Sequence, residues 1–279
     1  MAKTVNPNDW IGKQQYRSAV IDDRSSEMIA VTMGQPIPQA GEPLPTCWHW
    51  AWFNDALPAS ELGRDGHPKK GGFMPPIPLP RRMWAGGDIE FHEPIVIGKE
   101  HQKLSTIKNI VEKDGRSGRL FIVTIEHVVS CGKMVCVREN QNLVYRDDPV
   151  PGVPKPSPPE PPGNPDDTKE LCPDSVMMFR YSALTFNGHR IHYDVDYARE
   201  VEGYPGLVFH APLTATMLCR FAQDARPELP VRKFSYRATS PLYCGDKISL
   251  CAKDNGQSGT IVWATTPGGH QAMIGEVSF

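Results

Sequence analysis

A proline-rich stretch divides this chain into two halves of ordinary domain size. Residues 149–165 read PVPGVPKPSPPEPPGNP. Because proline lacks a backbone N–H and has a fixed φ, we expect an extended, polyproline II-like linker without a core of its own. The sequence therefore predicts an N-terminal domain at 1–148, a linker at 149–165 and a C-terminal domain at 166–279.

The two halves carry related patterns near their ends. Residues 113–118 contain Asp-Gly and residues 253–259 contain Asn-Gly, and an apolar run follows each turn. Such pairs between apolar runs are strong hairpin signals. A further apolar run comes next in each half, at 134–137 and at 272–274. We infer an internal duplication that produces two related antiparallel sheets.

One helix is expected in each half, ahead of these strands. Apolar residues recur at helical spacing over residues 212–224, where Pro212 suits a first-turn position. Residues 48–53 are apolar almost all round, which predicts a buried helix that ends near Pro58. The 24 glycines and 28 prolines favour strands and turns over a helical bundle. A sheet that wraps a long helix, twice, is the simplest architecture.

Charge, hydropathy and cysteine content narrow the class of protein. A net charge of −2 does not indicate a surface for nucleic acid or anionic membranes. No apolar run approaches the ~20 residues of a membrane span, and residues 1–7 lack the apolar core of a signal peptide. The seven cysteines are odd in number and form no CxxC, which favours buried, reduced thiols in a cytoplasmic protein.

The residues just before the C-terminal helix candidate suggest chemistry. They place the amide of Asn187, the imidazole of His192 and the carboxylate of Asp194 within eight residues, followed by a glycine-containing turn at 204–211. A site that adds water to an activated double bond must deprotonate water. It must also stabilise an oxyanion with backbone N–H groups.

The spacing of Asn187 and His192 resembles the hydratase signature of MaoC-like hot dog proteins, in which an aspartate stands five residues before the histidine. Residues 62–68 and 78–87 are similar to the subgroup that contains mitochondrial 3-hydroxyacyl-thioester dehydratase type 2 and bacterial itaconyl-CoA and mesaconyl-C4-CoA hydratases. The resemblance implies an α+β double hot dog fold, with two antiparallel sheets that each wrap a central helix. It also implies a hydro-lyase that hydrates a short, dicarboxylic enoyl-CoA thioester reversibly, as in itaconate degradation.

The resemblance assigns the proton transfer to His192, since an imidazole with a pKa near ~6.5 can take a proton from water and return it. Asn187 stands where the family has its catalytic aspartate, and an amide cannot act as a base. Either His192 is the sole base while Asn187 orients the water, or Asp194 supplies the missing carboxylate. The other interpretation of Asp194 is an ordinary first-turn acid that interacts with a helix dipole.

A metal site is not expected. His189 and His192 form an HxxH pair, and His210 or Asp194 would have to complete it. No HExxH motif or Cys/His cluster accompanies the pair. We therefore predict no metal and no cofactor, with coenzyme A entering as part of the substrate.

The start of the C-terminal helix is the predicted oxyanion site. The resemblance places His210 and Ala211 at this helix entry, where the Ala211 N–H would point at the thioester oxygen and Gly206 would belong to the same thioester-binding turn.

The proline-rich segment of the N-terminal half offers possible substrate contacts. Arg81 and Arg82 could clamp a carboxylate or a coenzyme A phosphate, and Trp84 lies beside them. No second hydratase signature occurs in this half, which is therefore expected to form the wall that receives the acyl group.

Two other functions remain open. One is a 3-hydroxyacyl-[acyl-carrier-protein] dehydratase of fatty acid synthesis, which would need an apolar acyl tunnel. The other is a catalytically silent acyl-CoA-binding hot dog protein, which the exchange of aspartate for Asn187 makes conceivable. The stereochemistry of water addition also stays open, and the resemblance suggests a homodimer. No nucleic-acid or membrane partner is expected.

Overall fold

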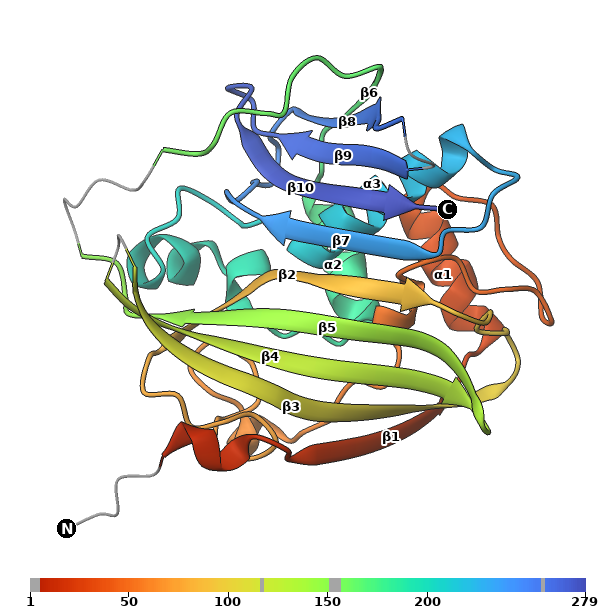
Figure 1. The fold of residues 1–279 in the computed structure, drawn as a ribbon. Helices are drawn as coiled ribbons and strands as arrows, with labels where there is room; N and C mark the ends of the chain where they lie inside the picture. The colour runs from red at the N-terminus through yellow and green to blue at the C-terminus, as the bar shows by residue number, and fades with distance from the viewer. Residues whose placement is uncertain (1–5, 116–117, 151–156, 257–258) are drawn as a thin grey trace, which may run out of the picture.

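The computed structural model describes residues 6–115, 118–150, 157–256 and 259–279. These residues form a ten-stranded antiparallel sheet with the strand order β1-β3-β4-β5-β2-β7-β10-β9-β8-β6 (Figure 1). The strands of the N-terminal half are β1 (Gln14–Val20), β2 (Arg81–Phe91), β3 (Glu100–Gly115), β4 (Gly118–Cys131) and β5 (Met134–Arg146). Those of the C-terminal half are β6 (Asp167–Leu171), β7 (Lys233–Ala238), β8 (Ile248–Asp254), β9 (Gly259–Thr265) and β10 (Gln271–Ser278).

The strand order repeats between the halves. Reading outward from the centre, it is β2-β5-β4-β3-β1 on one side and β7-β10-β9-β8-β6 on the other. This is the arrangement that an internal duplication predicts. The two expected hairpins join β3 to β4 and β8 to β9, although residues 116–117 and 257–258 of their turns lie outside the described residues.

The two predicted sheets are continuous with each other. Strand β2 pairs antiparallel with β7, from Gly86 opposite Arg237 to Glu90 opposite Lys233. Each half would otherwise present an unpaired edge at this position, and backbone groups at an edge need hydrogen-bond partners. Pairing of β2 with β7 satisfies both edges and brings the two halves into one curved layer.

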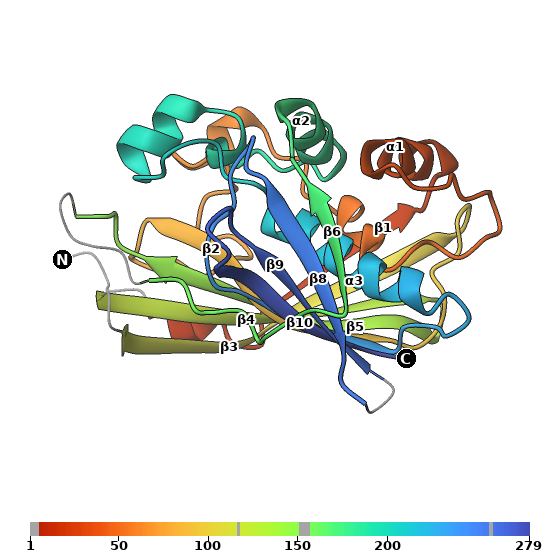
Figure 2. The same cartoon turned by 90° about the horizontal axis from the view of Figure 1, so that it is seen from above.

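Three α-helices lie on one side of this layer (Figure 2): α1 (Asp23–Met33), α2 (Ser175–Leu184) and α3 (Ala211–Ala225). Short 3-10 helices occur at Pro7–Trp10, Trp48–Ala51, Ala59–Glu61 and Arg190–His192, and a π-helical turn at Tyr197–Val201. Helix α3 is the helix predicted at 212–224, and it packs against the strands of the C-terminal half.

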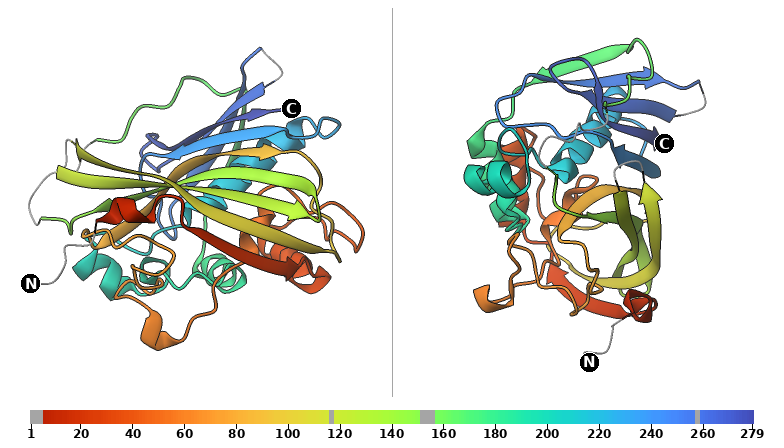
Figure 3. Two further views of the ribbon diagram at one scale, coloured as in Figure 1. Left: turned by 60° about the horizontal axis from the view of Figure 1, so that its bottom comes forward. Right: turned by 90° about the vertical axis from the view of Figure 1, so that its left-hand side faces the viewer.

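The helix predicted at 48–53 was wrong. Only Trp48–Ala51 form a 3-10 helix, because the backbone adopts positive φ at Cys47 (68°) and at Phe53 (63°) on either side of it. The prediction of burial holds, since Trp48, Trp52 and Phe53 are buried. No long helix therefore fills the N-terminal sheet in the described part of the chain, and the two views of Figure 3 show loops in that place.

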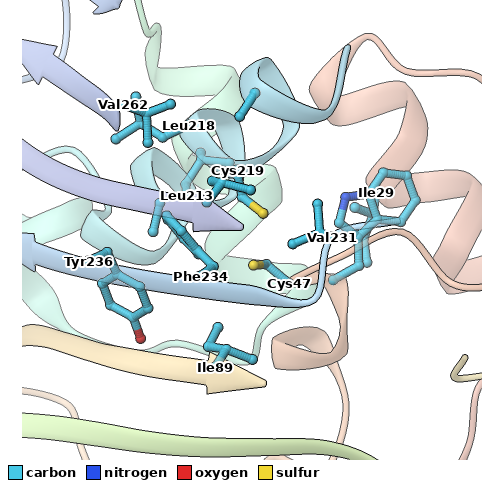
Figure 4. Packing of buried hydrophobic residues seen from close by; sticks show 14 of the residues in the cluster. Ile29, Cys47, Ile89, Leu213, Leu218, Cys219, Val231, Phe234, Tyr236 and Val262 are labelled. Carbon is cyan, nitrogen blue, oxygen red and sulfur yellow. The ribbon is translucent and has the colours of Figure 1, made fainter. Parts of the chain in front are cut away.

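The main core joins both halves (Figure 4). Leu213, Leu218 and Cys219 of α3 pack with Phe234 of β7 and Val262 of β9, and all five side chains are fully buried. Burial of each large apolar side chain contributes about 1.5–3 kcal/mol relative to exposure in water. This core holds α3 rigidly, and the start of α3 is where the site lies.

All seven cysteines are unpaired. Cys47, Cys136, Cys219 and Cys251 are buried, while Cys172 is exposed. The prediction of burial thus holds for four of the seven.

The proline-rich linker lies between β5 and β6, although its residues 151–156 are outside the described part. It contacts the C-terminal half where the Pro159 carbonyl oxygen accepts a hydrogen bond from the Gln271 N–H at 2.9 Å. No helix among the described residues is long and apolar enough to cross a membrane.

Candidate active site

A cavity of about 2390 Å³ lies between the two halves. It is lined by strands β2 to β5 of the N-terminal half, by the loop after α2 and by the start of α3. The space that a central helix would fill in the N-terminal half therefore remains open next to the predicted catalytic loop.

His192 lies at this cavity and is held in one tautomer. Its Nδ1 is 2.7 Å from the Val208 carbonyl oxygen, which can only accept, so Nδ1 carries the proton. The Nε2 atom then has a lone pair and no partner among the described residues. Burial lowers the pKa of His192 to about 4, although the hydrogen bond with Val208 raises it. A neutral imidazole with a free Nε2 is suited to accept a proton from water.

His210 supports His192 from behind. The two rings are stacked with centroids 3.7 Å apart, and His210 Nε2 lies 2.7 Å from the Ser182 hydroxyl. The His210 side chain is completely buried and does not line the cavity. The expectation that His210 binds the thioester was therefore wrong, and its place is that of a positioning residue.

Ala211 is the first residue of α3 and lines the cavity. Its N–H has no acceptor among the described residues, and Pro212 carries no N–H at all. A free N–H at a helix N-terminus, supported by the helix dipole, is suited to stabilise an oxyanion. Gly206 lies in the preceding loop and is not among the residues that line the cavity.

Asn187 lines the cavity, whereas Asp194 does not. The Asn187 Oδ1 accepts a hydrogen bond from the His189 N–H at 3.0 Å. The Asp194 carboxylate accepts from the Arg190 Nη2 at 2.7 Å and caps the Tyr197 N–H at 3.0 Å. The prediction that Asp194 assists catalysis was wrong, because its carboxylate is engaged away from the cavity, as the alternative of a helix-end acid predicted.

The two adjacent arginines have different environments. The Arg81 Nε donates to the Glu202 carboxylate at 2.5 Å in a largely buried pair, and its Nη2 donates to the Tyr204 hydroxyl at 3.1 Å. Arg82 makes no ion pair with any described residue, although its charge acts on Asp65 and Tyr145. Both arginines line the cavity, but the Arg81 guanidinium is already engaged by Glu202 and Tyr204.

Trp84 lines the cavity as well and stacks on Tyr236 with centroids 4.6 Å apart. Its indole ring forms an apolar part of the cavity wall.

Sequence reasoning missed a second histidine, which comes from the N-terminal half. The His67 ring lies 4.4 Å from the His189 ring, and its Nδ1 lies 3.0 Å from the Asp65 Oδ2. Burial and the charge of Arg82 lower the pKa of His67 to about 4, although the hydrogen bond with Asp65 raises it. Asp65 and His67 lie in residues 62–68, which carried the family resemblance, but nothing local indicated that they reach His189.

The donor atoms of Asp65, His67 and His189 lie within 4.8 Å of one another, a spacing compatible with a metal ion. Two features favour a hydrogen-bonded cluster instead. His67 Nδ1 and the Asp65 carboxylate already satisfy each other, and the guanidinium of Arg82 is close enough to lower the pKa of both groups. A neighbouring cation opposes the binding of another cation.

A second polar cluster, also missed, lies deeper in the N-terminal half. The buried Glu139 carboxylate accepts from the Trp50 Nε1 at 3.0 Å and lies 3.3 Å from the His49 Nε2. Burial by itself would raise the pKa of Glu139, but its bond with His49 and the nearby histidines lower it to about 2. Lys103 and His127 line the same part of the cavity. This part of the cavity, the polar chamber, therefore carries polar and charged side chains along one wall.

The chain is similar to known proteins over most of its length. A family model described as hydroxyacyl-thioester dehydratase type 2 matches residues 47–244. The chain is 44% identical over 250 residues to a mesaconyl-C(4)-CoA hydratase of Chloroflexus aurantiacus, covering 88% of this chain and 89% of the relative. It is 29% identical over 234 residues to a mitochondrial hydroxyacyl-thioester dehydratase type 2 of Schizosaccharomyces pombe, covering 75% of this chain and 77% of that protein.

Solved structures share the architecture. A MaoC-like dehydratase from Phytophthora capsici superposes with a TM-score of 0.71 at 16% identity, covering 99% of this chain and 98% of that one. A Mycobacterium tuberculosis protein described as a double hotdog superposes with a TM-score of 0.56 at 10% identity, covering 96% and 95%. The predicted double hot dog fold is thus confirmed.

Proposed function

Because the chain belongs to the hydroxyacyl-thioester dehydratase type 2 family and is a hydro-lyase, we propose that it hydrates a short, dicarboxylic enoyl-CoA thioester reversibly. Substrates of the mesaconyl-C4-CoA or itaconyl-CoA type fit this description. In this proposal the His192 Nε2 acts on the water, Asn187 lies beside the reacting atoms, and the Ala211 N–H stabilises the thioester oxygen.

The observation that carries the substrate class is Arg82. Its guanidinium faces the cavity close to His67 and has no carboxylate partner among the described residues. A carboxylate on the acyl group would be costly to bury without a cation, and a guanidinium binds it through two parallel hydrogen bonds. The 44% identity to a mesaconyl-C(4)-CoA hydratase and the polar chamber around Glu139 support the same class.

A 3-hydroxyacyl-[acyl-carrier-protein] dehydratase is the second candidate. Ile125 and Leu143 add an apolar surface to the cavity, and a volume of about 2390 Å³ exceeds what a five-carbon acyl group needs. A longer apolar chain could lie along this surface. The charged residues Lys103 and Glu139 farther along argue against it, since an alkyl chain cannot satisfy them.

The test is a comparison of hydration rates for mesaconyl-C4-CoA, itaconyl-CoA and crotonyl-CoA. We expect the dicarboxylic thioesters to have the higher kcat/KM. Arg82→Met should lower kcat/KM for them by about ten- to a hundredfold more than for crotonyl-CoA, the worth of a hydrogen bond to a charged group. A loss shared by all three thioesters would report the effect of the Arg82 charge on His67. Arg138→Met is the matched control, because Arg138 pairs with Glu126 outside the cavity. A preference for crotonyl-CoA that Arg82→Met leaves unchanged would contradict the proposed class.

Further parts of the proposal concern the conditions under which the enzyme works. Proton transfer alone suffices for the reaction, so we propose no cofactor besides the coenzyme A of the substrate. The unpaired cysteines support a reducing compartment such as the cytoplasm. A homodimer remains a proposal that rests on the family.

A further inference from the structure

Asn187 stands where the family has a catalytic aspartate. The catalytic loop therefore carries an amide, which cannot take a proton, in place of a carboxylate. A water molecule that attacks carbon is best oriented when both of its hydrogens have acceptors. His192 Nε2 supplies one acceptor. The Asn187 Oδ1 already accepts the His189 N–H, and the Asp194 carboxylate is bound by Arg190 outside the cavity. The remaining candidates near His192 are two other imidazoles that line the cavity, those of His189 and His67.

The geometry points to the N-terminal half. We propose that the Asp65–His67 pair is the second proton acceptor of the catalytic site and holds the reacting water together with His192. This inference rests on the proposed hydration reaction. It assigns chemistry to a half of the protein that carries no hydratase signature of its own.

The hydrogen bonds of His67 favour this role. Asp65 accepts the His67 Nδ1–H at 3.0 Å and the His67 backbone N–H at 3.1 Å. Because the carboxylate takes Nδ1–H, the proton is absent from Nε2, which has no partner among the described residues. His192 has the same tautomer for an equivalent reason, since Val208 accepts its Nδ1–H. The cavity thus has two imidazoles whose Nε2 lone pairs are both free.

The two imidazoles share one wall of the cavity. The His67 ring lies 4.4 Å from that of His189, which lies 5.4 Å from that of His192, and all three side chains line the cavity. The His189 Nε2 is buried and without a hydrogen-bond partner in the described structure, so the space between the rings can receive a polar ligand.

Backbone contacts fix the position of His67 relative to the catalytic loop. The Asp65 carbonyl oxygen accepts the Arg190 N–H at 2.9 Å, across the boundary between the halves. Gly66, at φ +85°, lies so close to Gly188 that a Cβ on Gly66 would be 1.9 Å from the Gly188 oxygen. The two loops are therefore held in direct backbone contact, which only glycine at position 66 allows.

The proposed step balances. Water loses a proton to one of the two Nε2 atoms while its oxygen bonds to the β-carbon. The π electrons move to the α-carbon, which then takes the proton from the imidazolium, so both histidines end neutral. The Asp65 carboxylate remains ionised and stabilises the positive charge while it resides on His67.

The test compares His67→Gln and Asp65→Asn with the unmodified enzyme, on the thioester that the unmodified enzyme hydrates fastest. We expect kcat to fall by about 10²–10³-fold with KM within threefold, as for loss of a proton-transfer group. Asp65→Asn keeps the shape of the side chain but offers an N–H to His67 Nδ1, which would move the proton to Nε2. Its effect therefore separates proton transfer from packing. His92→Gln, an exposed histidine 3.5 Å from Glu90, is the control and should be silent.

A rescue experiment makes the assignment specific. Asn187→Asp supplies a carboxylate at the family position, so we expect His67→Gln/Asn187→Asp to recover at least tenfold in kcat over His67→Gln. Folded variants without this recovery, or with more than a tenth of the original kcat in both single variants, would overturn the inference. Loss of activity in EDTA that zinc restores would overturn it too, in favour of a metal site. Failure of the proposed function would instead appear as an unmodified enzyme that hydrates none of the thioesters.

Discussion

Gly66→Ala should separate the two halves of the site without unfolding the protein. The added Cβ would lie 1.9 Å from the Gly188 oxygen, whereas real contacts of this kind are at least 3.0 Å. The loop that carries Asp65 and His67 must therefore move by about 1 Å away from the catalytic loop. A misplacement of about 1 Å in an active site can cost on the order of 10²-fold in rate. Alanine at φ +85° adds a backbone cost of roughly 1–2 kcal/mol.

Gly12→Ala is the matched control for this substitution. Gly12 has nearly the same φ, +87°, but nothing lies within 4 Å of its Cβ position. Gly12→Ala should lose roughly 1–2 kcal/mol in the free energy of unfolding, measured in urea, from the backbone cost alone, and Gly66→Ala should lose more because its Cβ also meets the Gly188 oxygen. Only Gly66→Ala should lose about 10²-fold in kcat/KM. The argument that this loop belongs to the active site would be refuted if folded Gly66→Ala kept kcat/KM within threefold of Gly12→Ala.

Four further outcomes follow from the structure. His192→Ala should lower kcat by about 10²–10⁴-fold while circular dichroism stays unchanged, and normal turnover would remove His192 as the base. Because burial holds the folded-state pKa of His192 at about 4, below its ordinary 6.5, the stability from this group is complete above pH 6.5 and falls as the pH drops toward 4. The free energy of unfolding should be measured by denaturant titration at pH 7 and at pH 4. Between these two pH values His192→Gln should lose less of this free energy than the unmodified protein, by up to roughly 3 kcal/mol. Asn187→Ala should damage kcat/KM more than Asn187→Asp, and the reverse order would exclude a water-orienting amide. Arg81→Met should lower the free energy of unfolding by about 3–5 kcal/mol, because it leaves Glu202 buried at 3% exposure without its cation, and a melting temperature equal to that of the unmodified protein would contradict this.

Most of the features that were predicted correctly depend on residues close together in the sequence. Helix α3 follows from apolar spacing and from Pro212 at its start, and the hairpins follow from turn pairs between apolar runs. The two halves repeat the same strand order, as the internal duplication inferred from these local patterns predicts. His192 at the cavity also came from a local motif, because five residues of loop place Asn187 and His192 on one wall.

The errors of local reasoning have a common cause. Residues 48–53 have the apolar content of a buried helix, yet positive φ at Cys47 and Phe53 confines them to one 3-10 turn. Spacing could not show that Asp194 pairs with Arg190 or that His210 packs behind His192. In each case the residue type alone did not decide the outcome. The backbone conformation or the direction of the side chain depended on groups that only the folded chain brings close.

The sequence by itself determined the repeated hairpins and the position of the C-terminal helix, because these depend on periodicity and short-range turns. The double hot dog fold and the choice of His192 came from the resemblance of its motifs to the family. Only the tertiary structure decided that Arg81, unlike Arg82, binds Glu202, and that Asp65 and His67 lie beside His189. These contacts join residues far apart in the chain. Their geometry depends on how closely two loops approach, which local sequence does not encode.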